Sequence, residues 1–329
     1  MIGLRKLGAA VAVAAVCIVF AGCPPESATG SLRVVIAPEE AVLAGAQWQV
    51  DGGDWQDSGA TVSGLTAGEH AVSYKALVGW AVVWETVSVT AGQPTAIEAE
   101  YGRGGAMAMF GGVEFAWCPP GTFLMGSDTG QIDEQPVHEV TLTQGFWMAT
   151  TEVTQGLWES VMGSNPARFT GDPARPIETV SWNDVQTFLT ELNEAYPGMG
   201  FRLPTEAEWE FACRAGSTTE YFFGDDAGLL VDYAWFIDDS EDTTHPVGQK
   251  LPNAWNLYDM TGNVWEWTED WAGDYGAGPE VDPLGPSTGS DRTLRGACWF
   301  NGSTGCGTAN RNDLDPNDTT DGIGFRLCR

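Results

Sequence analysis

Sulfur supplies the most reactive side chains of this 329-residue chain, which contains seven cysteines. Two of them, Cys17 and Cys23, lie in or at the end of an apolar N-terminal segment. The other five are Cys118, Cys213, Cys298, Cys306 and Cys328. Thiolates are soft ligands that suit copper(I), and thiols in an oxidising compartment form disulfides. An odd count of five leaves at least one thiol unpaired within a monomer.

Other kinds of catalytic site are missing from the sequence. There is no Gly-x-Ser-x-Gly nucleophile elbow and no phosphate loop ending in Gly-Lys-Ser/Thr. The three histidines, His70, His138 and His245, are far apart and have no metal-ligand spacing. The net charge of −30 argues against nucleic acid and anionic membrane surfaces as ligands. The same charge permits bound cations, which acidic oxygen ligands favour.

The first 22 residues have the pattern of a bacterial lipoprotein signal peptide. Arg5 and Lys6 precede an apolar run that is short for a membrane span. The run ends in Phe20-Ala-Gly-Cys23, which resembles a lipobox although Phe20 stands where Leu is usual. Cys23 is therefore the expected lipidation site and membrane anchor; an ordinary secretory signal is the alternative. Pro24 follows instead of an inner-membrane retention Asp, which favours the outer membrane of the bacterial envelope.

The chain after Cys23 divides into two folded regions. Residues 23–30 are expected to be a tether, and residues 31–101 to be a small all-β sandwich with strands near 32–36, 46–50, 70–74 and 87–90. The order of glycines and aromatics in 51–80 is similar to PEGA-type surface domains. A spacer that holds the larger domain off the membrane is the expected role, and a wall-binding or protein-binding module is the alternative. Gly-rich residues 102–111 are expected to be a linker.

Residues 112–329 form the larger region and carry the remaining cysteines. Alternating apolar residues predict strands at 137–143 and 146–152. Thr154, Ser181 and Thr205 are placed as N-caps of three helices, the last two with an acid three residues on. After about residue 214 the chain is rich in Gly, Asp, Asn, Pro and Trp with little periodicity, which predicts long ordered loops. Loops of this length usually need metal ions or disulfides to hold them.

Four segments in this region carry a family resemblance. They are Phe201–Glu210, Asn256–Trp267, Leu294–Trp299 and Gly322–Arg326. In this order they resemble the formylglycine-generating enzymes, also called sulfatase-modifying factors, over roughly residues 112–327. The resemblance implies an α+β fold of low regular content that is related to C-type-lectin-like domains. It also implies a founding activity in which copper and O2 oxidise a sulfatase cysteine to formylglycine.

The resemblance further implies a structural calcium ion in the Asn256–Trp267 segment. The matching positions are Asp259, Met260, Gly262 and Val264, with Glu266 nearby. Calcium prefers six to eight oxygen ligands, and a tight glycine-containing loop can direct several carbonyls to one centre. The alternative is a turn in which Asp259 and Asn263 bond their own backbone.

In the same segment, a strand would place Trp265 and Trp267 on one face, toward the core, and Glu266 on the other. Arginines are expected to form buried ion pairs with acids such as Glu206, Glu208 or Glu266. These arginines are Arg295, Arg311 and Arg326.

The copper-binding cysteine pair of the family oxidases is incomplete here. In the family the two thiols lie five residues apart, and counting forward from Cys298 places the first at Asn301 and the second at Cys306. Counting backward from Arg311 places the second at Ser303 or in a deletion. Copper is therefore not expected. Cys298 and Cys306 remain the candidates for an altered thiol site.

A disulfide competes for one of these thiols. The family oxidases pair a cysteine after the Trp-Glu helix with one near Arg311, and the resemblance places these at Cys213 and Cys306. Cys298–Cys328 is a weaker pairing. A bonded Cys306 could not ligate copper.

Three functions stay open at this level. The first is an extracytoplasmic binding or scaffolding module that has lost the copper chemistry, with a protein or envelope polymer as ligand. The second is a formylglycine-generating oxidase with an altered thiol site. The third is a lectin-like ligand-binding domain. The choice between enzyme and non-enzyme depends on the thiol site.

Overall fold

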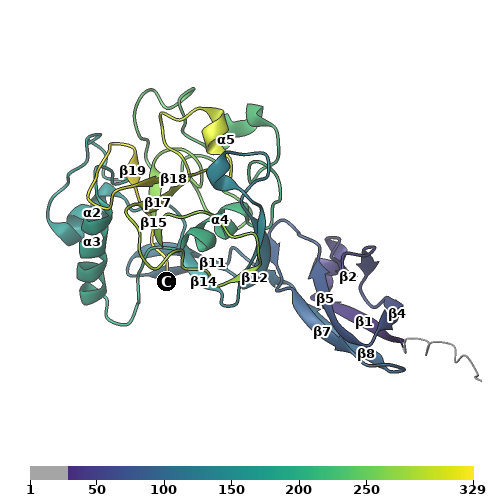
Figure 1. Cartoon of the computed structure of the whole chain (residues 1–329). Helices are drawn as coiled ribbons and strands as arrows, with labels where there is room; N and C mark the ends of the chain where they lie inside the picture. Colours follow the sequence, from purple (N-terminus) through teal and green to yellow (C-terminus); the bar gives the residue numbers. More distant parts are fainter. Residues whose placement is uncertain (1–28) are drawn as a thin grey trace, which may run out of the picture.

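The computed structural model describes residues 29–329. The expected signal peptide, Cys23 and nearly all of the tether lie outside this range. Figure 1 shows a small β domain beside a larger α+β body, joined through the strands that connect them. Among the described residues, no helix is long and apolar enough to cross a bilayer.

The small domain consists of two sheets packed face to face, as predicted. One has the order β4-β1-β8 and the other β3-β2-β5-β7. Their bounds are β1 Thr29–Ala37, β2 Gln47–Val50, β3 Gln56–Asp57, β4 Thr61–Thr66, β5 Gly68–Tyr74, β7 Glu85–Val89 and β8 Pro94–Glu100, with a short helix α1 at Glu39–Leu43. Alternate residues of the strands point inward, so Leu32, Val34, Trp48 and Tyr74 form a separate buried core.

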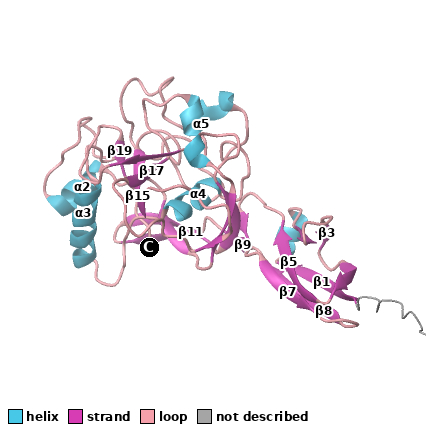
Figure 2. Cartoon of the chain, in the orientation of Figure 1, coloured by secondary structure: helices cyan, strands magenta, loops and turns pink. Residues whose placement is uncertain are grey.

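The larger body contains three small sheets and few helices (Figure 2). The sheet orders are β10-β11-β14, β12-β13-β16 and β18-β17-β15-β19. The strands are β10 Met107–Phe110, β11 Val113–Cys118, β12 Gly121–Met125, β13 His138–Leu142, β14 Phe146–Ala149, β15 Trp265–Trp271, β16 Glu280–Val281, β17 Arg292–Arg295, β18 Arg311–Leu314 and β19 Ile323–Gly324. The helices are α2 Gln155–Met162, α3 Trp182–Ala195, α4 Glu206–Arg214 and α5 Leu230–Tyr233, with short 3-10 turns η1 Ile132–Glu134, η2 Ala227–Leu229 and η3 Ser303–Cys306. This confirms an α+β fold of low regular content, and loops form most of residues 234–264.

The three helix starts were predicted correctly because each is capped locally. The Thr154 hydroxyl accepts a hydrogen bond from the Leu157 amide at 3.2 Å. Ser181 with Asp184, and Thr205 with Glu208, form complete capping boxes at α3 and α4. Caps of this kind satisfy backbone amides that the first helical turn leaves unpaired.

Residues 102–111 are not a free linker. Strand β9 (Gly102–Arg103) pairs with β6 (Trp80–Ala81) of the small domain, and β10 pairs with β11. The glycines here serve close packing, since a Cβ on Gly104 would lie 2.3 Å from the Trp255 ring. In this segment the glycines allow the backbone to pack closely against neighbouring side chains, and they do not form a flexible linker.

Backbone hydrogen bonds attach the small domain to the larger body. The Gly79 amide donates to the Ala215 carbonyl at 2.8 Å, and the Thr122 amide donates to the Val82 carbonyl at 2.9 Å. Gly216, just beyond α4, has a φ of +85°, and a Cβ there would lie 2.1 Å from the Leu77 carbonyl oxygen. The two bodies therefore meet without room for side chains at these points.

Buried ion pairs connect the central sheet with α4 and with the C-terminal segment. Arg295 pairs with Glu210, Arg311 with Glu206 and Arg326 with Glu266. Buried pairing of all three arginines was predicted; for Arg295 the strongest partner is Glu210, which the sequence did not indicate. Trp265 and Trp267 face the hydrophobic core as expected, and Glu266 on the other face accepts from the Trp209 indole at 2.7 Å.

Asp270, at the end of β15, should make folding stability depend on pH. Burial, followed by the nearby Glu206 charge, raises the pKa of Asp270 to about 8. A raised carboxyl pKa means that the folded state holds a proton that the unfolded state has released, so stability should fall between about pH 4 and about pH 8, by about 5 kcal/mol at most. Asp270→Asn keeps an acceptor for the Glu206 amide, which donates at 2.7 Å, and should remove this loss.

Thermal unfolding at pH 5 and pH 8 measures the effect. The Tm of D270N minus the Tm of the parent should be larger at pH 8 than at pH 5. Asp274→Asn, at an exposed neighbouring position, is the control and should follow the parent. A D270N profile parallel to the parent's would show that Asp270 is ionised in the folded state.

Candidate functional site

The expected thiol site lies in the loop after β17. Cys298 is fully buried, and its backbone amide donates to Asn301 Oδ1 at 2.9 Å. Its Sγ also donates to Asn301 Oδ1, at 3.0 Å. The Asn301 amide returns a bond to the Cys298 carbonyl at 3.0 Å. The carboxamide at the first expected ligand position thus closes a small hydrogen-bonded loop on the thiol.

Cys306, at the end of η3, is also buried. Its Sγ lies 3.7 Å from the Gly302 carbonyl, and its own carbonyl accepts from the Thr261 hydroxyl at 2.9 Å. Burial raises the pKa of the Cys306 thiol to about 11 and that of Cys298 further above its usual value. Both thiols are therefore protonated at neutral pH. Copper(I) prefers a pair of thiolates, and five residues before Cys306 the side chain is the Asn301 carboxamide, so the two-thiol ligand set is incomplete here.

Neither predicted disulfide is formed. Cys118, Cys213, Cys298, Cys306 and Cys328 are all free thiols in the structure. Cys213 on α4 packs in the core with Met260 and donates to its carbonyl at 3.6 Å, whereas Cys306 belongs to a different hydrophobic cluster. The pairing inferred from the family is therefore not formed, although both cysteines contact the Met260–Thr261 segment, Cys213 through its thiol and Cys306 through its carbonyl.

The expected calcium segment contains a pair of buried acids. Asp259 has a φ of +53°, and its Oδ2 accepts from the Gly248 amide at 2.6 Å. Its Oδ1 and both carboxyl oxygens of Glu152 are buried without a hydrogen-bond partner among the described residues. Burial raises the pKa of Asp259 to about 6, and burial with the adjacent Asp259 charge raises that of Glu152. Buried oxygens without donors are expensive, and a hard cation would satisfy them.

The other expected calcium ligands are placed differently. Glu266 uses both oxygens, since Arg326 and Trp209 donate to them. The Met260 carbonyl accepts from Cys213, as above. Gly262, with a φ of +80°, approaches Trp235 so closely that a Cβ would lie 2.3 Å from its carbonyl oxygen. Val264 is fully buried.

Glu152 is the residue that sequence reasoning missed. It follows β14, where the apolar alternation ends, and only the packing of Asp259 beside it reveals the pair.

Residues 29–329 contain no group of three or more His, Cys, Asp or Glu side chains able to hold a metal ion. A cation here would therefore depend on Asp259, Glu152 and backbone carbonyls together. The alternative turn is not formed, because the Asp259 carboxylate bonds the Gly248 amide and the Asn263 side chain bonds the backbone of His245.

Aromatic side chains form a patch beside the buried thiols. Trp299 packs edge to face with Phe169 and Phe300, at ring-centroid distances of 5.4 and 4.9 Å. Phe300 is 43% exposed, so part of this patch faces solvent. We call Phe169, Trp299 and Phe300 the aromatic patch. Rings of this kind bind flat apolar surfaces when a partner covers them.

The comparison with known proteins identifies the larger body. The family model described as the sulfatase-modifying factor enzyme 1-like domain matches residues 110–329. The chain belongs to this family. The formylglycine-generating enzyme of Streptomyces coelicolor is 35% identical over 195 residues, covering 52% of this chain and 60% of that enzyme. The mouse (Mus musculus) enzyme is 28% identical over 64% of this chain and 73% of its own length.

Solved structures show the same fold. PvdO from Pseudomonas aeruginosa superposes with a TM-score of 0.63 and 29% identity, covering 69% of this chain and 99% of PvdO. Treponema denticola variable protein 1 superposes with a TM-score of 0.62 and 30% identity, covering 68% of this chain and 98% of that protein. The chain spans less than two thirds of the Streptomyces enzyme, so family membership is established for the larger body and the activity of the whole relative does not follow from it.

Proposed function

We propose that this sulfatase-modifying factor family member is an envelope lipoprotein whose larger body binds or scaffolds rather than oxidises. The observation that carries the proposal is Asn301, whose carboxamide accepts the Cys298 thiol where an oxidase would place its first thiolate. The burial and protonation of Cys298 and Cys306 support the same conclusion. A binding role also suits the aromatic patch, which borders the altered site and reaches solvent.

An oxidase with an altered thiol site is the competing function. It would need Cys298 and Cys306 to lose their protons and approach each other, against the raised pKa of both thiols. Burial without a positively charged partner stabilises the neutral thiol. The free-energy cost of deprotonating these cysteines is therefore not offset by other groups in the loop.

Copper(I) titration and an aldehyde assay separate the two functions. The parent should show neither tight copper(I) binding nor O2-dependent aldehyde formation on a Cys-x-Pro-x-Arg peptide. Asn301→Cys restores the five-residue spacing to Cys306 and should gain copper binding, whereas Asn301→Ser, the matched control, should not. Aldehyde formation by the parent would establish the oxidase instead.

A calcium ion at Asp259 and Glu152 is the second part of the proposal. The buried unpartnered oxygens of these acids support it. Calcium at a hundredfold excess over Kd should raise the free energy of unfolding by about 2.7 kcal/mol, and a chelator should reverse this. Glu152→Gln and Asp259→Asn should lose most of the shift; asparagine tolerates the positive φ at position 259.

Thermal unfolding with calcium or chelator measures the shift. Asp315→Asn changes an exposed acid in another loop and should respond as the parent does. A calcium shift that survives in the E152Q/D259N double variant would place the ion elsewhere.

The third part is membrane attachment through lipid on Cys23, with outer-membrane placement favoured by Pro24. Cys23→Ser should move the protein from the membrane pellet to the soluble fraction after cell lysis. Cys17→Ser, within the expected signal peptide, is the control and should leave pelleting unchanged. Membrane pelleting of C23S equal to the parent would exclude the anchor.

A further inference from the structure

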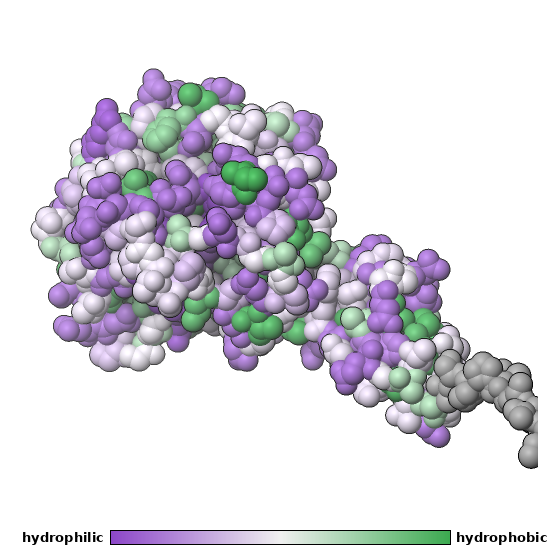
Figure 3. All heavy atoms as spheres, viewed as in Figure 1, coloured by the Kyte–Doolittle hydropathy of each residue, from purple (hydrophilic) through white to green (hydrophobic). Residues whose placement is uncertain are grey.

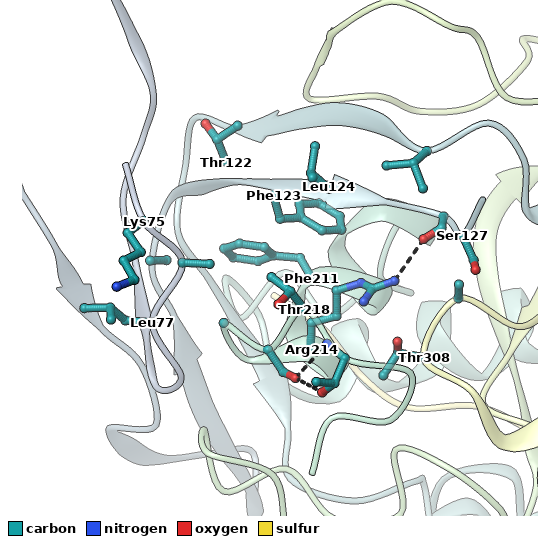
Figure 4. Close-up of a pocket in the computed structure, with 18 of the residues that line it drawn as sticks. Lys75, Leu77, Thr122, Phe123, Leu124, Ser127, Phe211, Arg214, Thr218 and Thr308 are labelled. Carbon is teal, nitrogen blue, oxygen red and sulfur yellow. Dashed lines mark hydrogen bonds between the residues drawn. The ribbon is translucent and has the colours of Figure 1, made fainter. Parts of the chain in front are cut away.

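A cavity of about 430 Å³ lies between the small domain and the larger body. It is within the size range of small-molecule sites, which often form between domains. Figure 4 shows side chains from both bodies around it, with Lys75 and Leu77 on one side and Phe123, Phe211 and Arg214 on the other. Cys298, Asn301, Cys306 and Asp259 are not among its lining residues, so the cavity is distinct from the sites described above.

The cavity walls are largely apolar. Phe123 and Phe211 pack with ring centroids 5.2 Å apart, and Trp80, Trp84 and Leu77 face them from the small domain. Figure 3 shows that the visible face of the protein is mostly hydrophilic, with hydrophobic residues in separate patches, some near the junction of the two bodies. Walls of this composition suit a flat apolar body.

Arg214 gives the cavity a charged group with an unused donor. The guanidinium donates through Nε and Nη2 to Glu210 Oε1, at 2.9 and 2.7 Å, and through Nη2 to the Gly126 carbonyl at 3.1 Å. Its third nitrogen, Nη1, makes no hydrogen bond to the described residues and is not among the fully buried atoms, although the whole residue is only 7% exposed. Nη1 is therefore free to bind an acceptor within the cavity.

The charge of Arg214 is only partly neutralised. Glu210 is shared between Arg214 and Arg295, so two arginines compete for one carboxylate. The cavity's carboxylates belong to exposed residues at its rim, namely Asp128, Glu220 and Asp225. Ser217 and Thr218, which follow α4, also line the cavity, and the Ser217 hydroxyl is hydrogen-bonded to Thr219. The interior thus offers the Arg214 guanidinium as a donor for an anion, and the rim is acidic.

We propose that this cavity binds a small amphipathic molecule that has a flat apolar body and one anionic group. The apolar body lies between Trp80 and the Phe123–Phe211 pair. The anion accepts a hydrogen bond from Arg214 Nη1. Since residues of both bodies form the site, the small domain is a part of the binding site as well as a spacer.

Two fluorescent probes test this proposal on the whole chain. They are 8-anilino-1-naphthalenesulfonate, which is anionic, and N-phenyl-1-naphthylamine, its neutral analogue. The sulfonate should bind about tenfold more tightly, as expected for one hydrogen bond between charged groups. A non-specific surface on a protein of net charge −30 would favour the neutral probe instead. Equal or tighter binding of the neutral probe would overturn the anion site.

Substitutions that fill the cavity provide a second test of the proposal. Thr218→Trp fills it from the larger body and Ala76→Trp from the small domain, both at exposed positions, and each should weaken sulfonate binding at least about tenfold. Thr187→Trp, at an exposed position on α3, is the matched control and should bind as the parent does. Circular dichroism and Tm identify a variant that has failed to fold. Undiminished binding by either folded cavity variant, or no binding by the parent, would overturn the proposal.

Discussion

The ion pair between Arg295 of β17 and Glu210 of α4 is the contact on which the larger body depends. Both residues are fully buried, and Glu210 also accepts from the Gly126 amide and from Arg214. One carboxylate therefore joins the central sheet, helix α4 and the loop after β12. Removing Glu210 would take the nearest carboxylate from both Arg214 and Arg295, and breaking a buried ion pair in this way typically costs about 3–5 kcal/mol. The surrounding loops have little regular structure of their own and rely on such fixed polar contacts.

Because the larger body has little regular structure, its thiol loop can vary while the core and the ion pairs keep the fold. The core residues and ion pairs lie on α4, β15 and β17, whereas Cys298, Asn301 and Cys306 lie in the loop that follows. A substitution in that loop alters the donor set without disturbing the sheet. Conversely, Asp259 lies in a loop directly bonded to Arg326 through its carbonyl, so its conformation is coupled to the core.

Local signals in the sequence predicted the helix starts, the inward face of Trp265 and Trp267, and the buried pairing of the arginines. Each of these follows from spacing within a few residues or from the need to neutralise a buried charge. Glu152, the Glu210 partner of Arg295 and the free state of Cys213 were not predictable in this way. They depend on which distant loops meet, and residues 234–264 carry no periodic pattern that fixes their path. The glycines of residues 102–111 were misinterpreted because close packing and flexibility select the same residue.

The docking of the small domain has a consequence for dissecting the protein. The family boundary at residue 110 divides the sequence, but the packing crosses it: Gly121 approaches the Ala81 side chain, and Gly104 lies against Trp255. A fragment that begins at residue 110 would bare the apolar surface around Phe211 and Trp255 to water. Such a fragment would be prone to self-association, so a fragment meant to fold alone should also keep the paired strands β6 and β9.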